Sequence, residues 1–152
     1  MAIATGTMTI TITESLDVGT TVMDTATSTA EEITVNDIYK RVITCPTSEI
    51  TLYNTHGSVP QGSTFDNNAV KYMRITNHDG SNFVHLRVSN NEGDEFVYKL
   101  AAGQSFILWG HVGTMNASQA AALTLGTGES SIMDVGAQAD SGACDLEIII
   151  AS

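Results

Sequence analysis

Basic residues are scarce in this chain. Six lysines and arginines stand against 17 aspartates and glutamates, which gives a net charge of −11. Proteins that bind nucleic acid generally neutralise several phosphates with lysine and arginine side chains. Four of the six basic residues are spread over predicted strands instead of forming one cluster: Lys71, Arg74, Arg87 and Lys99. The composition therefore argues against direct binding of DNA or RNA, and for the same reason against an anionic membrane surface.

Long apolar runs and a cysteine framework are also absent from the sequence. No window is apolar enough for a transmembrane span, and residues 1–15 lack the basic and apolar regions of a signal peptide. The two cysteines, Cys45 and Cys144, are too few for a disulfide framework or a cysteine metal site. They could pair with each other, but each lies in a strand pattern where cysteine packs as a small hydrophobic residue. We therefore expect free, buried thiols.

The remaining composition favours an ordered β protein. Charged residues make up 15% of the chain and hydrophobic residues 42%, while threonine, serine, asparagine and glycine are abundant. A chain of 152 residues with this balance can bury the core of one domain without metals or cross-links. Polar, uncharged surfaces of this kind are found where subunits contact one another. They are found equally in an ordinary threonine-rich β-sandwich. We expect one domain over residues 1–152, because no repeat or linker divides the chain.

The clearest pattern runs from Val70 to Trp109. Segments rich in Val, Ile, Phe and Tyr alternate there with turn residues at Asp79-Gly80 and at residues 91–93, which predicts a β-meander of four strands. Alternate residues of these strands should face the core. They are Met73, Ile75, Val84, Leu86, Val88, Phe96, Tyr98, Leu100, Phe106 and Leu108.

The flanking segments complete the predicted fold. Alternating apolar residues predict strands within residues 7–13, 33–45, 48–54 and 144–150. We interpret the acidic, threonine-rich residues 17–32 as a long surface loop with at most a short strand near residues 21–23. The alanine-rich residues 116–125 predict one short helix. Together these patterns predict an all-β protein: an antiparallel β-sandwich, jelly-roll-like, with at most one short helix and an N-terminal strand or arm of about residues 1–13.

No residue pattern points to catalysis or to a metal. The four histidines form no H-x-H or H-E-x-x-H pair and have no cysteine at ligand spacing. Acidic residues at the predicted turns are favoured there for backbone reasons and lack the spacing of a calcium loop. The sequence therefore predicts a protein without enzyme activity, metal or cofactor. The histidines are His56, His78, His85 and His111.

Several motifs together resemble one family. They are K-Y-M-R-I-T-N at residues 71–77, N-F-V at 82–84, F-V-Y-x-L at 96–100 and A-G-Q-S-F-I-L at 102–108. The opening G-T-M-T-I-T-I-T-E-S-L, Y-K-R at residues 39–41 and the ending D-L-E-I-I-I-A-S belong to the same set. This set resembles the small virion structural proteins of tailed bacteriophages, especially marine ones. The resemblance leaves out residues 17–32 and the alanine-rich stretch after His111.

The resemblance implies a non-enzymatic protein present in many copies on the capsid or in the tail, and made in the cytoplasm of the host bacterium. The small size, acidic surface and apolar terminal strands favour a capsid decoration (cement) protein that stabilises the head. Such a protein would form a homo-oligomer, a trimer, and contact the major capsid protein or other virion proteins.

Two alternatives remain at this point. The first is a tail, neck or fibre component of the virion. The second, from a different class, is a carbohydrate-binding or cupin-like module. Cupins, however, hold a metal with histidines and a carboxylate at set positions, where this chain offers Arg74, His85 and Arg87.

The candidate assembly interface centres on the N-terminal strand. A terminal strand with apolar side chains exposes unpaired backbone groups unless it finds a partner. A neighbouring subunit or the capsid could supply that partner, or the strand could fold into its own sandwich. The candidate interface residues are Ile3, Met8, Ile10, Ile12, Trp109 and His111.

Overall fold

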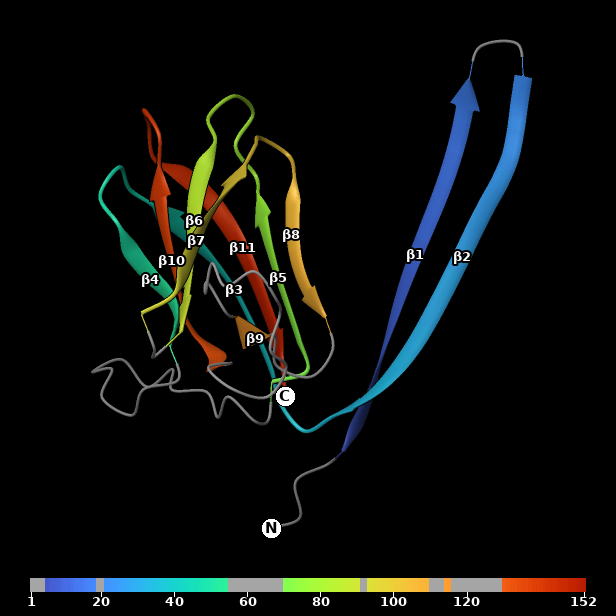
Figure 1. Cartoon of the computed structure of the whole chain (residues 1–152), viewed down its shortest axis with the longest axis horizontal. Coiled ribbons are helices and arrows are strands. Elements are labelled where there is room, and N and C mark those ends of the chain that lie inside the picture. Colours follow the sequence, from blue (N-terminus) through green and yellow to red (C-terminus); the bar gives the residue numbers. More distant parts are fainter. Residues whose placement is uncertain (1–4, 19–20, 55–69, 91–92, 110–113, 116–129) are drawn as a thin grey trace, which may run out of the picture. The chain divides into compact units, whose positions relative to one another are not determined.

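The computed structural model describes residues 5–18, 21–54, 70–90, 93–109, 114–115 and 130–152 (Figure 1). These residues form eleven strands and no helix. The chain divides into two compact units, Met1–Asp37 and Ile38–Ser152, which we call the arm and the body. The helix predicted over residues 116–125 lies outside the described residues.

The body contains two antiparallel sheets that pack face to face (Figure 1). The sheet that we call the β11 sheet has the order β3 (Ile38–Cys45), β11 (Cys144–Ala151), β5 (Tyr72–Asn77) and β8 (Ser105–Trp109). The β10 sheet has the order β4 (Ile50–Asn54), β10 (Ser130–Ala139), β6 (Val84–Asn90) and β7 (Glu95–Leu100), and β9 (Thr114–Met115) pairs with the start of β10.

The order of the strands gives the topology. Apart from the short β9, successive strands of the body lie in opposite sheets, and β6 and β7 are the exception because they form a hairpin. The last two strands of the chain lie beside the first two strands of the body: β11 lies beside β3, and β10 lies beside β4. Two Greek keys wound in this way form a jelly roll. The predicted all-β, jelly-roll-like sandwich is thus confirmed.

The predicted meander over residues 70–109 is wrong in its connections. Only β6 and β7 are hydrogen-bonded neighbours, whereas β5 and β8 pair with each other in the opposite sheet. The turn at Asp79-Gly80 therefore leads from one sheet to the other instead of closing a hairpin. An alternating apolar pattern specifies one buried face, and a strand can satisfy it in either sheet.

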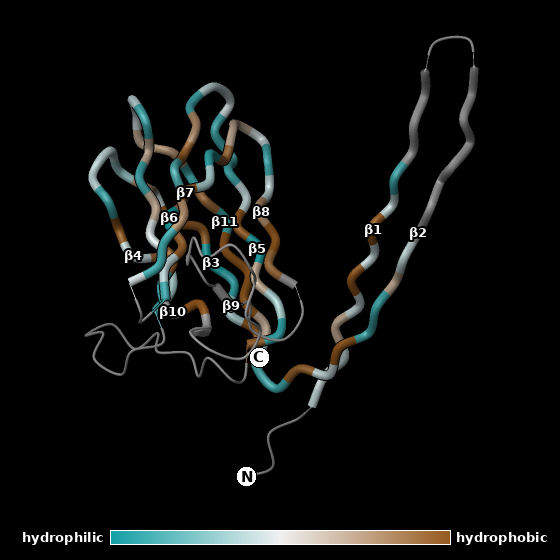
Figure 2. Tube along the Cα trace, viewed as in Figure 1, coloured by the Kyte–Doolittle hydropathy of each residue, from teal (hydrophilic) through white to brown (hydrophobic). Residues whose placement is uncertain are grey.

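The core lies between the sheets and consists of the alternate residues of their strands, which appear as hydrophobic segments in Figure 2. Six of the predicted core positions in residues 70–109 are buried, and Phe106 and Leu108 pack partly buried against them. Phe96 and Tyr98 are each 40% exposed, because β7 is an edge strand with a neighbour on one side only. The six buried positions are Met73, Ile75, Val84, Leu86, Val88 and Leu100.

A buried asparagine joins the two connections at one end of the sandwich. The Nδ2 group of Asn77 donates to the carbonyl oxygens of Asn82, at 2.9 Å, and Leu100, at 3.3 Å. Its Oδ1 accepts a hydrogen bond from the backbone N–H of Asp79 at 3.0 Å. The backbone of Asn77 also bonds to Gly103 and Gln104 in the β7–β8 turn. One fully buried amide thus links β5 to both turns.

Replacing Asn77 by leucine should therefore destabilise the body. Leucine keeps a similar volume but leaves the buried partners of the amide without hydrogen bonds, and each such group costs about 1–3 kcal/mol. Urea unfolding of the full chain measures the effect, with the exposed Ser81→Ala as the control in the same turn. Equal, small losses for both variants would contradict the role given to Asn77.

The two cysteines lie opposite each other. Cys45 ends β3 and its register partner Cys144 begins β11. Both are free and fully buried, as the sequence predicts. Burial raises the pKa of the Cys45 thiol and of the Cys144 thiol. Both groups should therefore remain protonated and poorly reactive in the native protein.

Thiol labelling tests this state. We expect native protein to react slowly with a maleimide reagent, because neither sulfur is exposed and the thiolate fraction is small. After unfolding in denaturant, both thiols of the chain should label. Two rapidly labelled thiols in the native protein, or none after unfolding, would contradict the assignment.

The arm is an antiparallel hairpin of β1 (Gly6–Val18) and β2 (Thr21–Val35). The predicted surface loop over residues 17–32 is therefore wrong, because most of it belongs to the second strand. Its weak pattern has a physical reason: a two-stranded ribbon outside the sandwich needs few apolar residues, and the β-branched threonines still favour an extended backbone. The arm accordingly reaches Asp37, beyond the predicted boundary near residue 13.

Candidate functional site

The structure brings three of the predicted interface residues together on the arm. Met8, Ile10 and Ile12 alternate along β1, so they share one face of the hairpin. Trp109 ends β8 in the body, and the structure describes its backbone only. Ile3 and His111 lie outside the described residues.

The shared face of the arm is apolar along one half of the hairpin. Ile33 lies opposite Met8 and Val35 lies opposite Gly6, so β2 adds two apolar residues to the same face. Ile10 and Val35 are buried, while Ile12 is 41% exposed. We call these five residues the apolar face of the arm: Met8, Ile10, Ile12, Ile33 and Val35.

The opposite face of the arm differs in character. Its residues on β1 from Thr7 to Thr13 are threonines, and all four are exposed. Their partners on β2 are polar or small, with Glu32 opposite Thr9 and Ala30 opposite Thr11. We call this the threonine face: Thr7, Thr9, Thr11, Thr13 and Thr34.

A second apolar surface lies on the body and was not predicted. On the β11 sheet the residues between the core positions point away from the β10 sheet. Three large hydrophobic residues of this outer face are exposed: Ile38 at 55%, Val42 at 57% and Ile107 at 43%. Ile149 of the central strand lies between Lys40 and Arg74 in the register and is half-buried.

A signal for this surface was present in the sequence. A strand with one solvent-exposed face alternates between apolar and polar residues. Residues 148–150 and 106–109 are instead continuously apolar, I-I-I and F-I-L-W, which places apolar residues on both faces of β11 and β8.

Charged side chains cross the same outer face. Glu147 of β11 accepts a hydrogen bond from Arg74 on β5 at 2.5 Å and forms an ion pair with Lys40 on β3 at 3.1 Å. The hydrogen bonds from Lys40 and from Arg74 hold the pKa of the Glu147 carboxyl below its ordinary value. One carboxylate is thus shared by two cations from the strands on either side.

The lowered pKa predicts a pH dependence of stability. A carboxylate whose pKa is lower in the folded state stabilises the protein at neutral pH, and this contribution disappears as the pH falls through the folded-state pKa. Glu147→Gln should therefore lower the urea midpoint at about pH 7, and the difference from the wild type should shrink at about pH 3. A difference that stays the same, or grows, at the acidic pH would contradict the ion-pair assignment.

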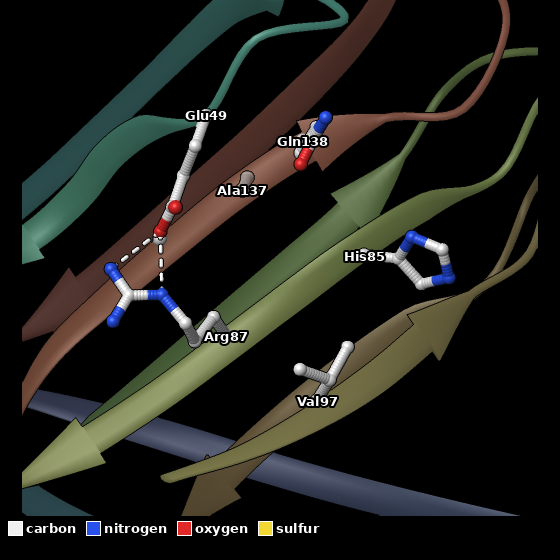
Figure 3. Close-up of a pocket in the computed structure, with 7 residues that line it drawn as sticks. Glu49, His85, Arg87, Val97, Ala137 and Gln138 are labelled. Atoms are coloured by element: carbon white, nitrogen blue, oxygen red, sulfur yellow. Dashed lines mark hydrogen bonds and ion pairs between the residues drawn. The ribbon is translucent and has the colours of Figure 1, made fainter. Parts of the chain in front are cut away.

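The outer face of the β10 sheet carries a small depression of about 180 Å³ (Figure 3). Arg87 lies in it and donates to Glu49 at 2.6 Å and to Glu95 at 3.3 Å. Gly136 lies beside the Glu49 carboxylate, and a side chain at this position would meet it. The other residues that line the depression are His85, Val97, Ala137 and Gln138.

This depression lacks the features of an active site. The charge of Arg87 is balanced by two carboxylates, so it is not available to a ligand anion. None of the lining residues is a tryptophan, tyrosine or phenylalanine on which a sugar ring could stack. Among the described residues, no cluster of three histidine, cysteine or acidic side chains could hold a metal ion.

The residues compared with a cupin metal site do not meet. Arg74 lies on the outer face of the β11 sheet, whereas His85 and Arg87 lie on the outer face of the β10 sheet. His78 is exposed in the β5–β6 connection, and His56 lies outside the described residues.

Comparison of the chain with protein-family models, with curated proteins and with solved structures finds no significant match. In the part of the chain that the structure describes, no helix has the length and apolar character needed to cross a membrane. The candidate functional surfaces are therefore the apolar face of the arm and the outer face of the β11 sheet.

Proposed function

We propose that the protein is a non-enzymatic structural protein of a tailed-bacteriophage virion, and within it a capsid decoration (cement) protein that stabilises the head. It acts as a homotrimer on the capsid surface, in contact with the major capsid protein, and is made in the cytoplasm of the host bacterium. The observation that carries this proposal is the arm: a long hairpin with an apolar face, attached to a body that has a complete core of its own.

The arm supports an assembly role on physical grounds. A two-stranded hairpin is at best marginally stable in water by itself. All members of the hydrophobic core cluster belong to the body, so the arm does not contribute to that core. A subunit that must hold neighbours has a use for such an extension.

The body fits the same role without proving it. Jelly rolls occur in viral capsid proteins, in lectins and in cupins, so the fold alone does not separate these functions. The sequence motifs that resemble phage virion proteins favour the first class. The ion-paired depression, with no aromatic platform for a sugar, disfavours a carbohydrate-binding module.

Locating the protein in purified virions tests the proposal. We expect the chain in many copies in the head fraction after heads and tails are separated, and recombinant protein should bind heads that lack it. Detection only in the tail fraction would favour a tail, neck or fibre component instead. Absence from virions would overturn the proposal as a whole.

A deletion of residues 1–37 links binding to the arm. We expect the remaining body to fold, because its core is complete, but to lose most of its binding to heads. Circular dichroism and urea unfolding of the body provide the control for folding. Undiminished binding by a folded body would contradict an assembly role for the arm.

A further inference from the structure

The outer face of the β11 sheet exposes large apolar side chains to solvent. Tyr72 and Ala151 at one end of this face are already buried, so the open part lies over the neighbouring rows of the sheet. The next row presents cations and apolar side chains in alternation: Lys40, Ile149, Arg74 and Ile107. The row after it begins with Val42 and Glu147, and Ile38 is exposed at the edge of the first row.

The apolar face of the arm has the complementary composition. Besides its apolar residues, this face carries Glu31 opposite Ile10, and Glu14 two positions beyond Ile12. Both carboxylates are exposed. The arm thus presents apolar side chains interspersed with anions. The sheet presents apolar side chains beside Lys40 and Arg74, which share the single carboxylate of Glu147. Both patterns repeat every second residue of a strand, roughly 6.5–7 Å, so they can be placed in register.

The distribution of charge in the chain points to the same pairing. Residues 1–37 contain six carboxylates and no lysine, arginine or histidine, so all six basic residues of the chain belong to the body, together with eleven carboxylates. Strands β3 and β5 place Lys40 and Arg74 on the outer face. These two cations share Glu147, and the Lys40 side chain remains 61% exposed. Two arms packed on each other would instead bring carboxylates together without any cation.

We propose that the apolar face of the arm of one copy packs on the outer face of the β11 sheet of a second copy. This inference rests on the proposed function, because it names the partner that the arm holds. Glu31 and Glu14 of the arm then face the Lys40 and Arg74 side of the neighbouring sheet. Each copy gives one arm and receives one, and such a head-to-tail contact closes into a ring when the rotation between copies allows it.

Cross-linking between two distinguishable full-length chains tests the contact. One chain carries Ile12→Cys, the other carries Ile107→Cys and a different affinity tag, and both keep the buried native cysteines. After mixing through co-expression, a short bismaleimide should join the two tagged chains. The matched control is Thr11→Cys in place of Ile12→Cys, because Thr11 is adjacent in sequence but lies on the threonine face. We expect the yield of cross-linked product to be lower by about tenfold, because the side chain at residue 11 points away from the proposed contact.

The outcomes that overturn this inference are specific. Equal cross-linking from Thr11→Cys and Ile12→Cys would show that the apolar face is not the contact. Cross-links that form only within a single chain carrying both Ile12→Cys and Ile107→Cys would show that the arm packs on its own body. A cross-link from Ile107→Cys to a capsid subunit in place of a second copy would assign the sheet face to the capsid.

A charge exchange provides an independent measurement. Glu31→Lys should raise the dissociation constant of the oligomer, measured by light scattering, by about tenfold, equivalent to about 1.4 kcal/mol. Adding Lys40→Glu to the same chain should restore much of the affinity, because the opposite charges meet again. Glu32→Lys, on the threonine face, is the control and should have a smaller effect. A double variant weaker than Glu31→Lys alone, or a wild type that stays monomeric at every concentration, would contradict the contact.

Cross-linking between copies and light scattering use purified protein without virions, and only the cross-link to a capsid subunit requires heads. The first two measurements therefore fail separately from the proposed function. Protein found in heads whose arms do not cross-link to a second copy would overturn the inference and leave the decoration role. Arms that cross-link between copies of a protein absent from virions would support the inference and overturn the decoration role.

Discussion

The packing of the β11 sheet against the β10 sheet is the interaction on which the rest of the structure depends. The inner residues of the central strands, such as Ile148 on β11 and Val135 on β10, are almost completely buried, and burial of such side chains is worth about 1.5–3 kcal/mol each. All members of this core cluster belong to the body.

The two outer faces differ in their ion pairs and in their exposed aliphatic side chains. On the β10 sheet, Arg87 is held between Glu49 and Glu95, and Val97 is exposed beside it. On the β11 sheet, the large aliphatic side chains of Ile38, Val42 and Ile107 stand exposed among charged ones. The arm adds an apolar face and a concentration of negative charge. These two features are the ones on which the proposed assembly role rests.

The sequence was sufficient to predict the fold class, but not to predict which strands pair with one another. Strict alternation at Met73 and Ile75, or at Val84 and Leu86, identifies the strands and their buried faces. It does not identify the sheet to which a strand belongs, so the predicted meander confused a sheet-to-sheet turn with a hairpin. The second strand of the arm was missed for the opposite reason: outside a core, a strand can be polar on both faces and then resembles a loop.

The sequence likewise predicts one part of the candidate site and misses the other. Met8, Ile10 and Ile12 alternate with threonines, so their common face could be predicted from the sequence. Residues such as Val42 and Ile107 were missed, because a prediction that assigns one buried face to each strand treats the other face as solvent-exposed. Only the register across β3, β11, β5 and β8 shows that these side chains share one surface.

The central claim is that a partner, and not the chain's own core, stabilises the arm. Amide hydrogen exchange of the full chain at increasing protein concentration measures this most directly, because it reports local stability strand by strand. The account predicts that protection of the β1 and β2 amides rises with concentration, while protection of core amides such as Leu86 stays constant. Strong protection of the arm that does not change with concentration, in a protein that remains monomeric, would contradict it.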